Sequence, residues 1–594
     1  MNYFHYDSIV NVGASSELIT KHSALVAELS GCNVLASTFN HRYLNLQEKN
    51  QIKNFVDLGN FDHLMMTIRP SAKKLIDANR DINEQYFRHC TEVLFLVNSM
   101  ARYDIPVGIV DQSILETVAN GSSDLSAVVE GLKKFVREIS DLFPSGNDFG
   151  KTFPYISHFH KIKPKLAHKR IRSLSEFACS NAIVDPMLYA QQISEQENHI
   201  FWLGFDPKFK AVPHEKAYSV GYFKEELKHA KQGEGLFEQQ LRYCSRCCLP
   251  ETMEGMSFDE LGMCVPCRSS EDKMHIDWEE KRKEFERIMA GNKQSDYYDC
   301  LLPMSGGKDS TYQAYLLKFV VDAMPLAVTH GHGWHTHEGR YNLENCLQQF
   351  DLDHIFFCVA RTKINKAAKK SLMNIGDACW HCHIGAGSFP LVSALAWDVK
   401  LMCYGESAAE KGGRSRYATN TEAPLLYHVE ISAKVRAEDY ADDQITTREL
   451  SCWYYPNAEE LKNSELRYIH IGNYFFWDEA RQVEFIKRNF NWLDSKVENT
   501  YKGFKSVECV MAGVHDYANF IKRGIGRATI HVSDDVRRGL MTREEGFEIA
   551  KAYDTQRPHA LDFYLGITGI TEDEFNKTLI EARSKSKYAS RLKR

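Results

Sequence analysis

A buried strand that runs into a glycine turn, and from there into a helix, constrains the fold of this chain more than any other feature. Residues 300–304 read as an apolar strand and residues 311–320 as an apolar helix. The six residues between them are Ser305, Gly306, Gly307, Lys308, Asp309 and Ser310. The glycines allow a sharp turn that directs backbone N–H groups and the positive end of the helix at an anion. Lys308 adds a point charge, so the segment predicts a phosphate site within an α/β fold.

This turn is distinct from the Walker A pattern, which places four residues between its first glycine and its Gly-Lys-Ser/Thr end. It resembles the Ser-Gly-Gly-x-Asp-Ser signature of the PP-loop ATP pyrophosphatases, which cleave ATP to AMP and pyrophosphate. The resemblance implies a parallel-sheet PP-loop domain that takes ATP and Mg²⁺. It also implies that all six turn residues bind the nucleotide and that Lys308, Asp309 and Ser310 take part in catalysis.

Two further strands predict the rest of the nucleotide pocket. One covers residues 325–329 and ends at His330, and another ends at Gly405 and Glu406. Carboxyl ends of neighbouring parallel strands open into one crevice, so these three residues are expected to contact the nucleotide. Two alternatives stay open. The histidine-rich loop that begins at His330 could ligate a metal, and Glu406 could be a Mg²⁺ ligand or a surface charge.

Two Cys-x-x-Cys pairs predict a structural metal site. Cys244 and Cys247 form the first pair, and Cys264 and Cys267 form the second after a gap of sixteen residues. Each pair directs two thiolates at one point, and two such knuckles complete the tetrahedral site that Zn²⁺ prefers. Since the protein would fill all four positions, the zinc is expected to be structural. Cys248 leaves the first pair ambiguous, because it could replace Cys247.

A third pair, Cys379 and Cys382, lies inside the predicted PP-loop domain. Such a pair can bind a second Zn²⁺ or an iron–sulfur cluster when a third ligand comes from elsewhere in the chain. Cys509 is the candidate for that ligand. Reduced, buried thiols without a metal are the alternative.

The composition fits a cytoplasmic protein with several domains. A chain of 594 residues exceeds what one hydrophobic core supports. The net charge of −6 argues against non-specific binding of nucleic acid. Neither a signal peptide nor a membrane-spanning stretch is apparent, and clustered pairs among the 16 cysteines indicate metal or redox chemistry.

The chain divides into four predicted domains. An α/β domain of unknown role covers residues 1–235 and a zinc ribbon covers residues 240–275. The PP-loop domain covers residues 276–430, and a helix-rich region that completes the enzyme covers residues 431–594. The turn that begins at Gly13 follows a predicted strand and reads as an ordinary strand-to-helix turn. No internal repeat is apparent.

Residues 240–580 resemble the N-acetyl sugar amidotransferases of bacterial surface-polysaccharide and nonulosonic-acid pathways. The motifs that carry the resemblance occur in the family's order: residues 258–264, 305–310, 379–382, 405–407, 515–517, 524–529 and 542–546. Two positions depart from the family pattern, since Ser407 replaces an asparagine and Lys411 replaces a common aromatic residue. Residues 1–240 have no counterpart in the family.

The resemblance implies that an acetamido group of a lipopolysaccharide or related surface sugar becomes an acetamidino group. AMP would pass from ATP to the amide oxygen, and ammonia would then displace it from the adenylated imidate. No glutaminase motif is apparent in the chain, so a separate glutamine-hydrolysing subunit is expected to supply the ammonia. Five basic residues suit a nucleotide or carboxylate on the sugar, or else form a solvated helix face: Lys522, Arg523, Arg527, Arg537 and Arg538.

Two other functions stay open. A tRNA sulfur transferase would combine the same zinc knuckles, PP-loop and Cys-x-x-Cys pair, with sulfur as the nucleophile, although the acidic net charge counts against it. A binding or assembly protein would hold a partner with residues 1–240 and use the ATP domain for regulation. The intact Lys308 and Asp309 count against that reading.

Overall fold

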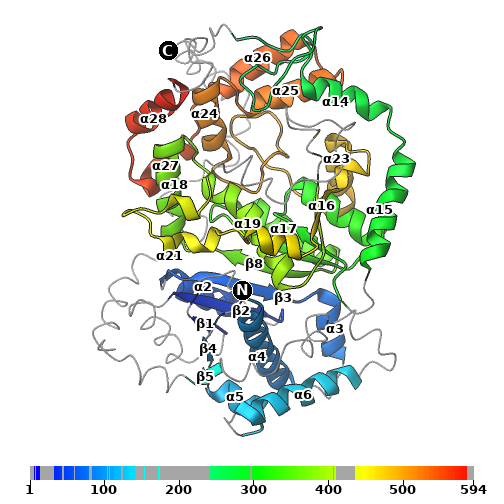
Figure 1. Cartoon of the computed structure of the whole chain (residues 1–594), viewed down its shortest axis with the longest axis vertical. Helices are drawn as coiled ribbons and strands as arrows, with labels where there is room; N and C mark the ends of the chain where they lie inside the picture. The colour runs from blue at the N-terminus through cyan, green and yellow to red at the C-terminus, as the bar shows by residue number, and fades with distance from the viewer. Residues whose placement is uncertain are drawn as a thin grey trace.

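Ten strands of the described residues hydrogen-bond into one sheet in the computed structural model of this chain (Figure 1). The structure describes residues 241–584 apart from 294–296, 406, 408 and 410–434. Nearer the N-terminus it describes residues 6–141 apart from 7, 14–32, 43, 45, 59, 79–82, 104, 106, 111 and 122–124, together with 153 and 171–173.

The strand order in the sheet is β10-β9-β6-β7-β8-β3-β2-β1-β4-β5. These strands are β1 (Ser8–Asn11), β2 (Val34–Asn40), β3 (Asp62–Thr67), β4 (Val107–Val110), β5 (Ile171–Ser173), β6 (Cys300–Pro303), β7 (Pro325–Gly331), β8 (Asp353–Cys358), β9 (Leu401–Tyr404) and β10 (Arg467–His470). Neighbouring strands are parallel, except that β3 and β8 are antiparallel. A mixed α/β fold, as expected from the sequence, is confirmed.

Each half of the sheet has the strand order of a doubly wound nucleotide-binding fold. In β6–β10 the first strand is central, with the second and third on one side and the fourth and fifth on the other. Strands β1–β5 have the same order. A ligand crevice opens between the first and fourth strands of such a sheet, because the winding reverses there. The two halves of the sheet therefore share one strand order, which the sequence did not indicate.

Helices surround the β6–β10 half, and three of them bear on the candidate site. Helix α16 (Lys308–Tyr315) follows β6, so the helix expected from residue 311 begins three residues earlier and takes Lys308 into its first turn. Helix α18 (Arg361–Ile375) follows β8. Helix α19 (Trp380–Ala396) packs against β7 and leads into β9.

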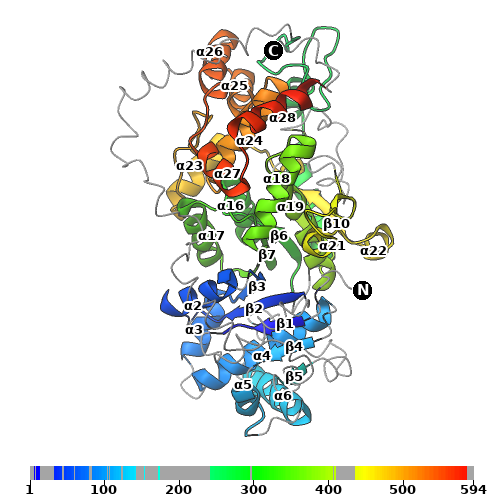
Figure 2. The same ribbon diagram turned by 90° about the vertical axis from the view of Figure 1, so that its left-hand side faces the viewer.

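The remaining helices belong to both halves of the molecule. Figures 1 and 2 show the C-terminal helices, in orange and red, at the end opposite the blue β1–β5 half. The N-terminal helices are α2 (Leu46–Leu58), α3 (Pro70–Ala78), α4 (Glu84–Arg102), α5 (Gln112–Val118) and α6 (Leu125–Asp141). The others are α14 (Val265–Met274), α15 (Trp278–Asn292), α17 (His337–Gln349), α21 (Thr447–Leu450), α22 (Ala458–Asn463), α23 (Glu479–Phe490), α24 (Ala512–Arg523), α25 (Arg527–Arg537), α26 (Arg543–Asp554), α27 (Ala560–Thr568) and α28 (Glu572–Ser584). In the part of the chain that the structure describes, none of the helices has the length and apolar character needed to cross a membrane.

A carboxyl group, Glu92 of α4, is buried beside the end of β1. Asn11 donates a hydrogen bond from Nδ2 to Glu92 Oε2 at 3.0 Å. Burial raises the pKa of Glu92 from 4.5 to about 7, although the Asn11 amide and the charge of Arg88 oppose the shift. Between about pH 4.5 and 7 the folded protein keeps a proton on Glu92 that the unfolded chain has already released. The contribution of Glu92 to the free energy of unfolding therefore falls as the pH rises through this range.

Glu92→Gln is expected to stabilise the protein at pH 8 by up to about 3 kcal/mol and to change its stability little at pH 4.5, since glutamine mimics the protonated acid. Urea unfolding at the two pH values measures this difference. An equal effect of the substitution at both pH values would show that Glu92 does not retain a proton in the folded protein.

Candidate functional site

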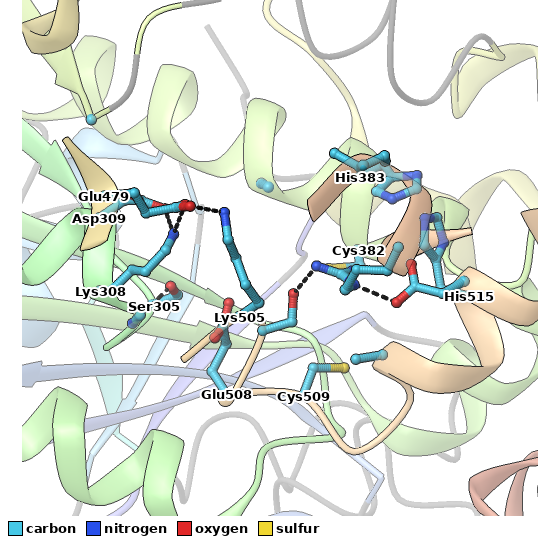
Figure 3. Close-up of a pocket in the computed structure, with 18 of the residues that line it drawn as sticks. Ser305, Lys308, Asp309, Cys382, His383, Glu479, Lys505, Glu508, Cys509 and His515 are labelled. Carbon is cyan, nitrogen blue, oxygen red and sulfur yellow. Dashed lines mark hydrogen bonds and ion pairs between the residues drawn. The ribbon is translucent and has the colours of Figure 1, made fainter. Parts of the chain in front are cut away.

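A cavity of about 730 Å³ opens beside the turn that follows β6 (Figure 3). Its walls come from this turn, the ends of β7 and β9, the start of α19 and the segment that joins α23 to α25. The predicted site residues that line it are Ser305, Gly307, Lys308, Asp309, Ser310, His330, Cys379, Cys382, Gly405 and Cys509. Gly306 is not among the lining residues, and Glu406 lies outside the described part of the chain.

The turn at residues 305–310 keeps its shape through close backbone contacts. Gly306 has a φ of +81°, in the left-handed region, and a Cβ there would lie 2.6 Å from the backbone nitrogen of Leu343. Trp492 donates a hydrogen bond from Nε1 to the Gly306 carbonyl at 3.0 Å. Ser310 Oγ donates to the Gly307 carbonyl at 3.1 Å. The first N–H groups of α16 have no intrahelical acceptors, as at any helix start, and they are available to phosphate oxygens.

Gly306→Ala is expected to lower the free energy of unfolding by about 2–4 kcal/mol and to weaken nucleotide binding, because the methyl group meets backbone atoms at a positive φ. Urea unfolding and titration with an ATP analogue measure the two effects. Gly291→Ala in α15 is the control, since open space surrounds that position and alanine favours a helix. If the Gly306→Ala protein were as stable as the Gly291→Ala protein, the conclusion that position 306 requires glycine would be contradicted.

A pair of lysines and a carboxylate stand at the phosphate turn. Lys308 Nζ lies 2.6 Å from Glu479 Oε1 and also bonds Asp309. Lys505 bonds the second oxygen of Glu479, so this carboxylate bridges the two lysines, as Figure 3 shows. The sequence analysis missed Glu479 and Lys505. The capping residue Asp478 marks the start of α23 and hence a place for Glu479, but no motif links it to the turn.

A second carboxyl group, Glu508, faces the turn from the opposite side. Its oxygens lie 3.4 Å from the position that a Cβ on Gly307 would take. Burial raises the pKa of Glu508, while the charge of Lys308 opposes the shift. This residue was also missed, because it is supplied by an irregular segment far from the turn along the chain.

Buried histidines lie at the end of β7 and in the loop that follows it, beside the cavity. Burial lowers the pKa of His330 to about 3 and that of His332 to about 4, so both rings are neutral at pH 7. The rings of His332 and His335 stack with their centroids 3.9 Å apart. Among the described residues these histidines belong to no group of donors close enough to hold a metal ion. A neutral ring at His330 can donate or accept a hydrogen bond, as a nucleotide-pocket residue requires.

The thiols of Cys379, Cys382 and Cys509 reach the same cavity. Cys382 comes from the start of α19 and Cys509 from the segment before α24, and Figure 3 shows both at the cavity. Burial raises the pKa of Cys382 to about 12 and raises the pKa values of the other two thiols as well. In the described ranges the three do not form a group with all ligand atoms within 4.8 Å of one another. A metal at these thiols therefore stays a prediction.

An imidazole pair lies next to these thiols. His383 Nδ1 is 3.2 Å from Asp377 Oδ2, and the ring centroid of His515 is 5.2 Å from that of His383. Burial lowers the pKa of His515 to about 3, so its ring is neutral, and it lies 2.9 Å from the Asn519 amide. Both histidines line the cavity, which makes them candidates for proton transfer there.

Most of the predicted basic cluster lines the far wall of the cavity: Arg523, Arg527, Arg537 and Arg538. Lys522 is not among the lining residues and donates a hydrogen bond to the Gly376 carbonyl at 2.7 Å. Arg527 bonds Asp516 and donates to Ser506 Oγ at 2.7 Å, which fixes its guanidinium in the wall.

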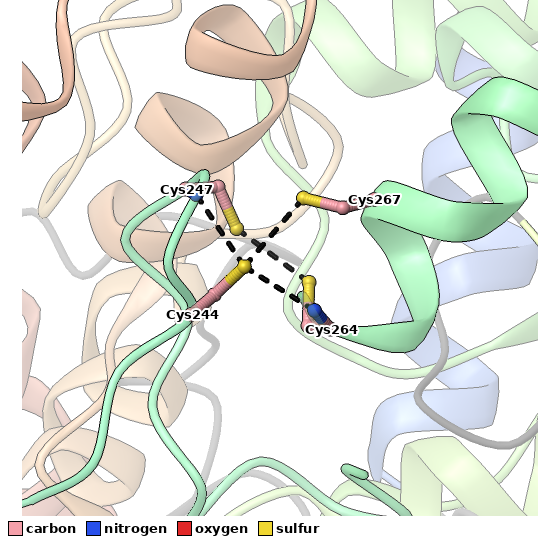
Figure 4. A group of neighbouring side chains, drawn as sticks. All are labelled: Cys244, Cys247, Cys264 and Cys267. Atoms are coloured by element: carbon pink, nitrogen blue, oxygen red, sulfur yellow. Dashed lines mark hydrogen bonds between the residues drawn. The ribbon is translucent and has the colours of Figure 1, made fainter. Parts of the chain in front are cut away.

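Four buried cysteines form a separate group on the ribbon (Figure 4). The sulfur atoms of Cys244 and Cys267 are 3.7 Å apart, and those of Cys247 and Cys264 are 3.6 Å apart. Tetrahedral zinc with Zn–S bonds of about 2.3 Å requires sulfur atoms separated by roughly 3.8 Å, so the group can hold a metal such as zinc. Cys248 is not part of it, because its thiol donates to the Arg543 carbonyl at 3.4 Å.

A comparison with family models finds one segment of similarity. Residues 498–593 match the C-terminal domain of the LPS biosynthesis protein WbpG-like family. The matched segment contains α24 to α28 and supplies Lys505, Glu508, Cys509 and Arg527 to the cavity. The similarity is to a domain of lipopolysaccharide biosynthesis proteins and covers this C-terminal segment alone. Among curated proteins, no sequence matches this chain.

Proposed function

We propose that this chain is an ATP-dependent, AMP-forming amidotransferase that converts an acetamido group of a bacterial surface sugar into an acetamidino group. One observation carries the proposal: the phosphate turn with Lys308 opens into a cavity whose other wall comes from the segment that is similar to lipopolysaccharide biosynthesis proteins. The ATP site and the sugar site would thus lie in the same cavity.

The chemistry follows from the low reactivity of an amide. Its carbonyl oxygen would attack the α-phosphorus of ATP, and pyrophosphate would leave with the electron pair of the broken P–O bond. Ammonia would then add to the carbon of the adenylated imidate, and AMP would leave with the former amide oxygen. Loss of a proton gives the neutral amidine, so each turnover consumes one ATP and one ammonia.

Residues of the turn wall suit the nucleotide. The N–H groups at the start of α16, together with Lys308 and Lys505, would stabilise the negative charge that develops on the phosphates. Asp309 and Glu479 are carboxylates beside those lysines and would hold the Mg²⁺ that accompanies ATP. Glu406 remains a further proposed ligand for this ion.

The four-cysteine group is proposed to bind a zinc ion and to form a zinc ribbon. Its donors are four thiols, which suits a closed structural site and leaves no open position for a substrate. Arg537 supports that assignment, because its Nη1 lies 3.9 Å from the sulfur of Cys247 and would offset thiolate charge.

The partner of the reaction would be a glutamine-hydrolysing subunit that delivers ammonia. Free ammonium at high concentration would replace it in a simple assay. His383 lines the cavity with its Nδ1 3.2 Å from Asp377 Oδ2, and it would accept the proton that ammonia loses.

The test supplies the purified chain with ATP, Mg²⁺ and ammonium, together with either N-acetylated nonulosonic acids and UDP-sugars or bulk tRNA and sulfide. The proposal predicts ammonium-dependent AMP release with a sugar and a product in which NH replaces O. The thiols at the cavity favour tRNA thiolation as a second candidate, since sulfur carriers require such groups. AMP release only with tRNA and sulfide would overturn the sugar proposal.

A further inference from the structure

The two halves of the sheet repeat each other in register. In the first half Leu35 lies opposite Asp62, and in the second half Leu326 lies opposite Asp353. These residues occupy the same positions within their strands, because Leu35 and Leu326 are each the second residue and both aspartates the first. The two pairs of strands are therefore built on one plan.

The sequences of the matched segments agree with this register. Residues 34–41 read VLASTFNH and residues 325–332 read PLAVTHGH, with Leu, Ala, Thr and His at the same places. Strands β3 and β8 both begin with Asp-His. Four identities in eight residues at one register are more than an α/β fold requires, since only the apolar character of a buried strand is needed.

Polar contacts between side chains repeat as well. His63 Nε2 lies 2.9 Å from Thr38 Oγ1, and His354 Nε2 lies 2.8 Å from Thr329 Oγ1. Each contact joins the second residue of the third strand to the fifth residue of the second strand. A polar pair of this kind is specific to a sequence, so the repetition indicates a common origin and not merely a common architecture.

The two copies face each other across β3 and β8 as the subunits of a two-fold dimer do. The backbone N–H of Arg69 donates to Asp353 Oδ1 at 2.8 Å, and the backbone N–H of Ala360 donates to Asp62 Oδ1 at 2.8 Å. Each aspartate begins its strand and accepts from the residue two positions beyond the end of the other strand. Such reciprocal contacts are the mark of an isologous interface.

We propose that strands β1–β5 are a second copy of the nucleotide-binding fold that no longer binds nucleotide and serves as a built-in partner subunit along the edge of β8. The sequence after β1 reads Gly-Ala-Ser-Ser from Gly13, without the lysine of the catalytic turn. The carboxyl group of Glu92 occupies the space beside Gly13, because a Cβ on Gly13 would lie 3.0 Å from Glu92 Oε2.

The built-in partner pairs with the strand that packs beside the loop after β7. Met65 of β3 lies opposite Phe356 of β8, which places these two equivalent residues at the centre of the interface. The Phe356 ring fills the space beside Gly331, where a Cβ would lie 2.7 Å from its Cζ, and its centroid lies 6.0 Å from that of His335. Strand β8, which pairs with the fused copy, therefore also supports the loop after β7 that forms one side of the cavity.

The first test measures how many nucleotides the full chain binds, and it rests on the proposed function. Equilibrium dialysis with α,β-methylene-ATP is expected to give one bound nucleotide per chain, and the Lys308→Ala variant is expected to bind it about 10- to 100-fold more weakly. Two nucleotides per chain, or one bound with unchanged affinity in the Lys308→Ala variant, would overturn the inactive copy. No binding to the unaltered chain would instead reject the proposed function, and a second measurement then decides the inference.

That second measurement compares matched variants on the two sides of the interface. Tyr6 Oη donates to Asp62 Oδ2 at 2.6 Å, and Tyr298 Oη donates to Asp353 Oδ2 at 2.9 Å. Tyr6→Phe and Tyr298→Phe are each expected to lower a single calorimetric Tm by roughly 1–3 °C. Two separate unfolding transitions, with Tyr6→Phe shifting only one of them, would show independent domains and overturn the built-in partner. Tyr341→Phe at a half-exposed position is the control and is expected to leave the Tm unchanged.

Discussion

Lys308→Ala is expected to weaken the binding of an ATP analogue about 10- to 100-fold, since charge-assisted contacts to phosphate contribute roughly 1.5–3 kcal/mol. The loss of AMP formation is expected to be larger, because the charge on the phosphates grows in the transition state. The side chain of Lys308 is 6% exposed and is held by Asp309 and Glu479, which directs its ammonium group to the cavity. Calorimetric titration with the analogue measures the effect on binding.

Lys370→Ala is the matched control for the removal of a buried lysine. The side chain of Lys370 is also 6% exposed, bonds the Tyr440 carbonyl and lies 2.6 Å from Asp442, away from the cavity. Its replacement is expected to lower stability and to leave nucleotide affinity unchanged. Equal affinities in the two variants would contradict a phosphate-binding role for Lys308.

Cys247→Ser is expected to reduce the zinc content of the purified chain from one ion to none and to lower the Tm by roughly 10 °C. A structural zinc ion contributes folding free energy directly, and three thiols hold it far more weakly than four. The effect is expected to reach the cavity. Arg543 of α26 donates hydrogen bonds to the carbonyls of Cys244 and Cys247, and Ile525 next to α25 packs on the cysteine group.

The neighbouring Cys248 supplies the control. Its side chain packs with Val532 and Ala550 in a separate cluster, so Cys248→Ser is expected to keep the zinc ion while losing some packing energy. Elemental analysis of both variants measures the metal directly. Full zinc content in the Cys247→Ser protein, or equal losses in the two variants, would contradict the assignment of ligands.

Features fixed by short-range chemistry were predictable from the sequence. The turn at residues 305–310 and the Cys-x-x-Cys pairs that begin at Cys244 and Cys264 are each formed by residues close together in the sequence. A short sequence pattern is therefore enough to identify them. The structure also separates Cys247 from Cys248, a choice that spacing alone left open. It places the turn, His330 and Gly405 around one cavity, because the carboxyl ends of β6, β7 and β9 meet there.

Residues that reach the cavity from distant segments were not predictable. A helix start supplies Glu479, and an irregular loop supplies Lys505 and Glu508. All three are far from the turn in the sequence, and no sequence motif sets this separation. Only the packing of α23 beside α16 brings Glu479 to Lys308.

The internal repeat was missed for a different reason. The matched strands are short, and their apolar residues look like those of any buried parallel strand. What identifies the repeat is the pairing of Thr38 with His63 and of Thr329 with His354, and these contacts exist only in the folded chain. The residues that follow Gly13 gave only a weak signal, because they lack the lysine and the second glycine of the catalytic turn, and residues 14–32 lie outside the described part of the chain.

The fate of the amide oxygen tests the central claim most directly. An N-acetyl sugar substrate labelled with a heavy oxygen isotope in its acetamido carbonyl would be turned over with ATP, Mg²⁺ and ammonium, and the nucleotide products would be weighed by mass spectrometry. An adenylated imidate predicts that the label appears in AMP and that pyrophosphate is unlabelled. Label in inorganic phosphate, with ADP as the nucleotide product, would contradict AMP-forming activation of the sugar amide.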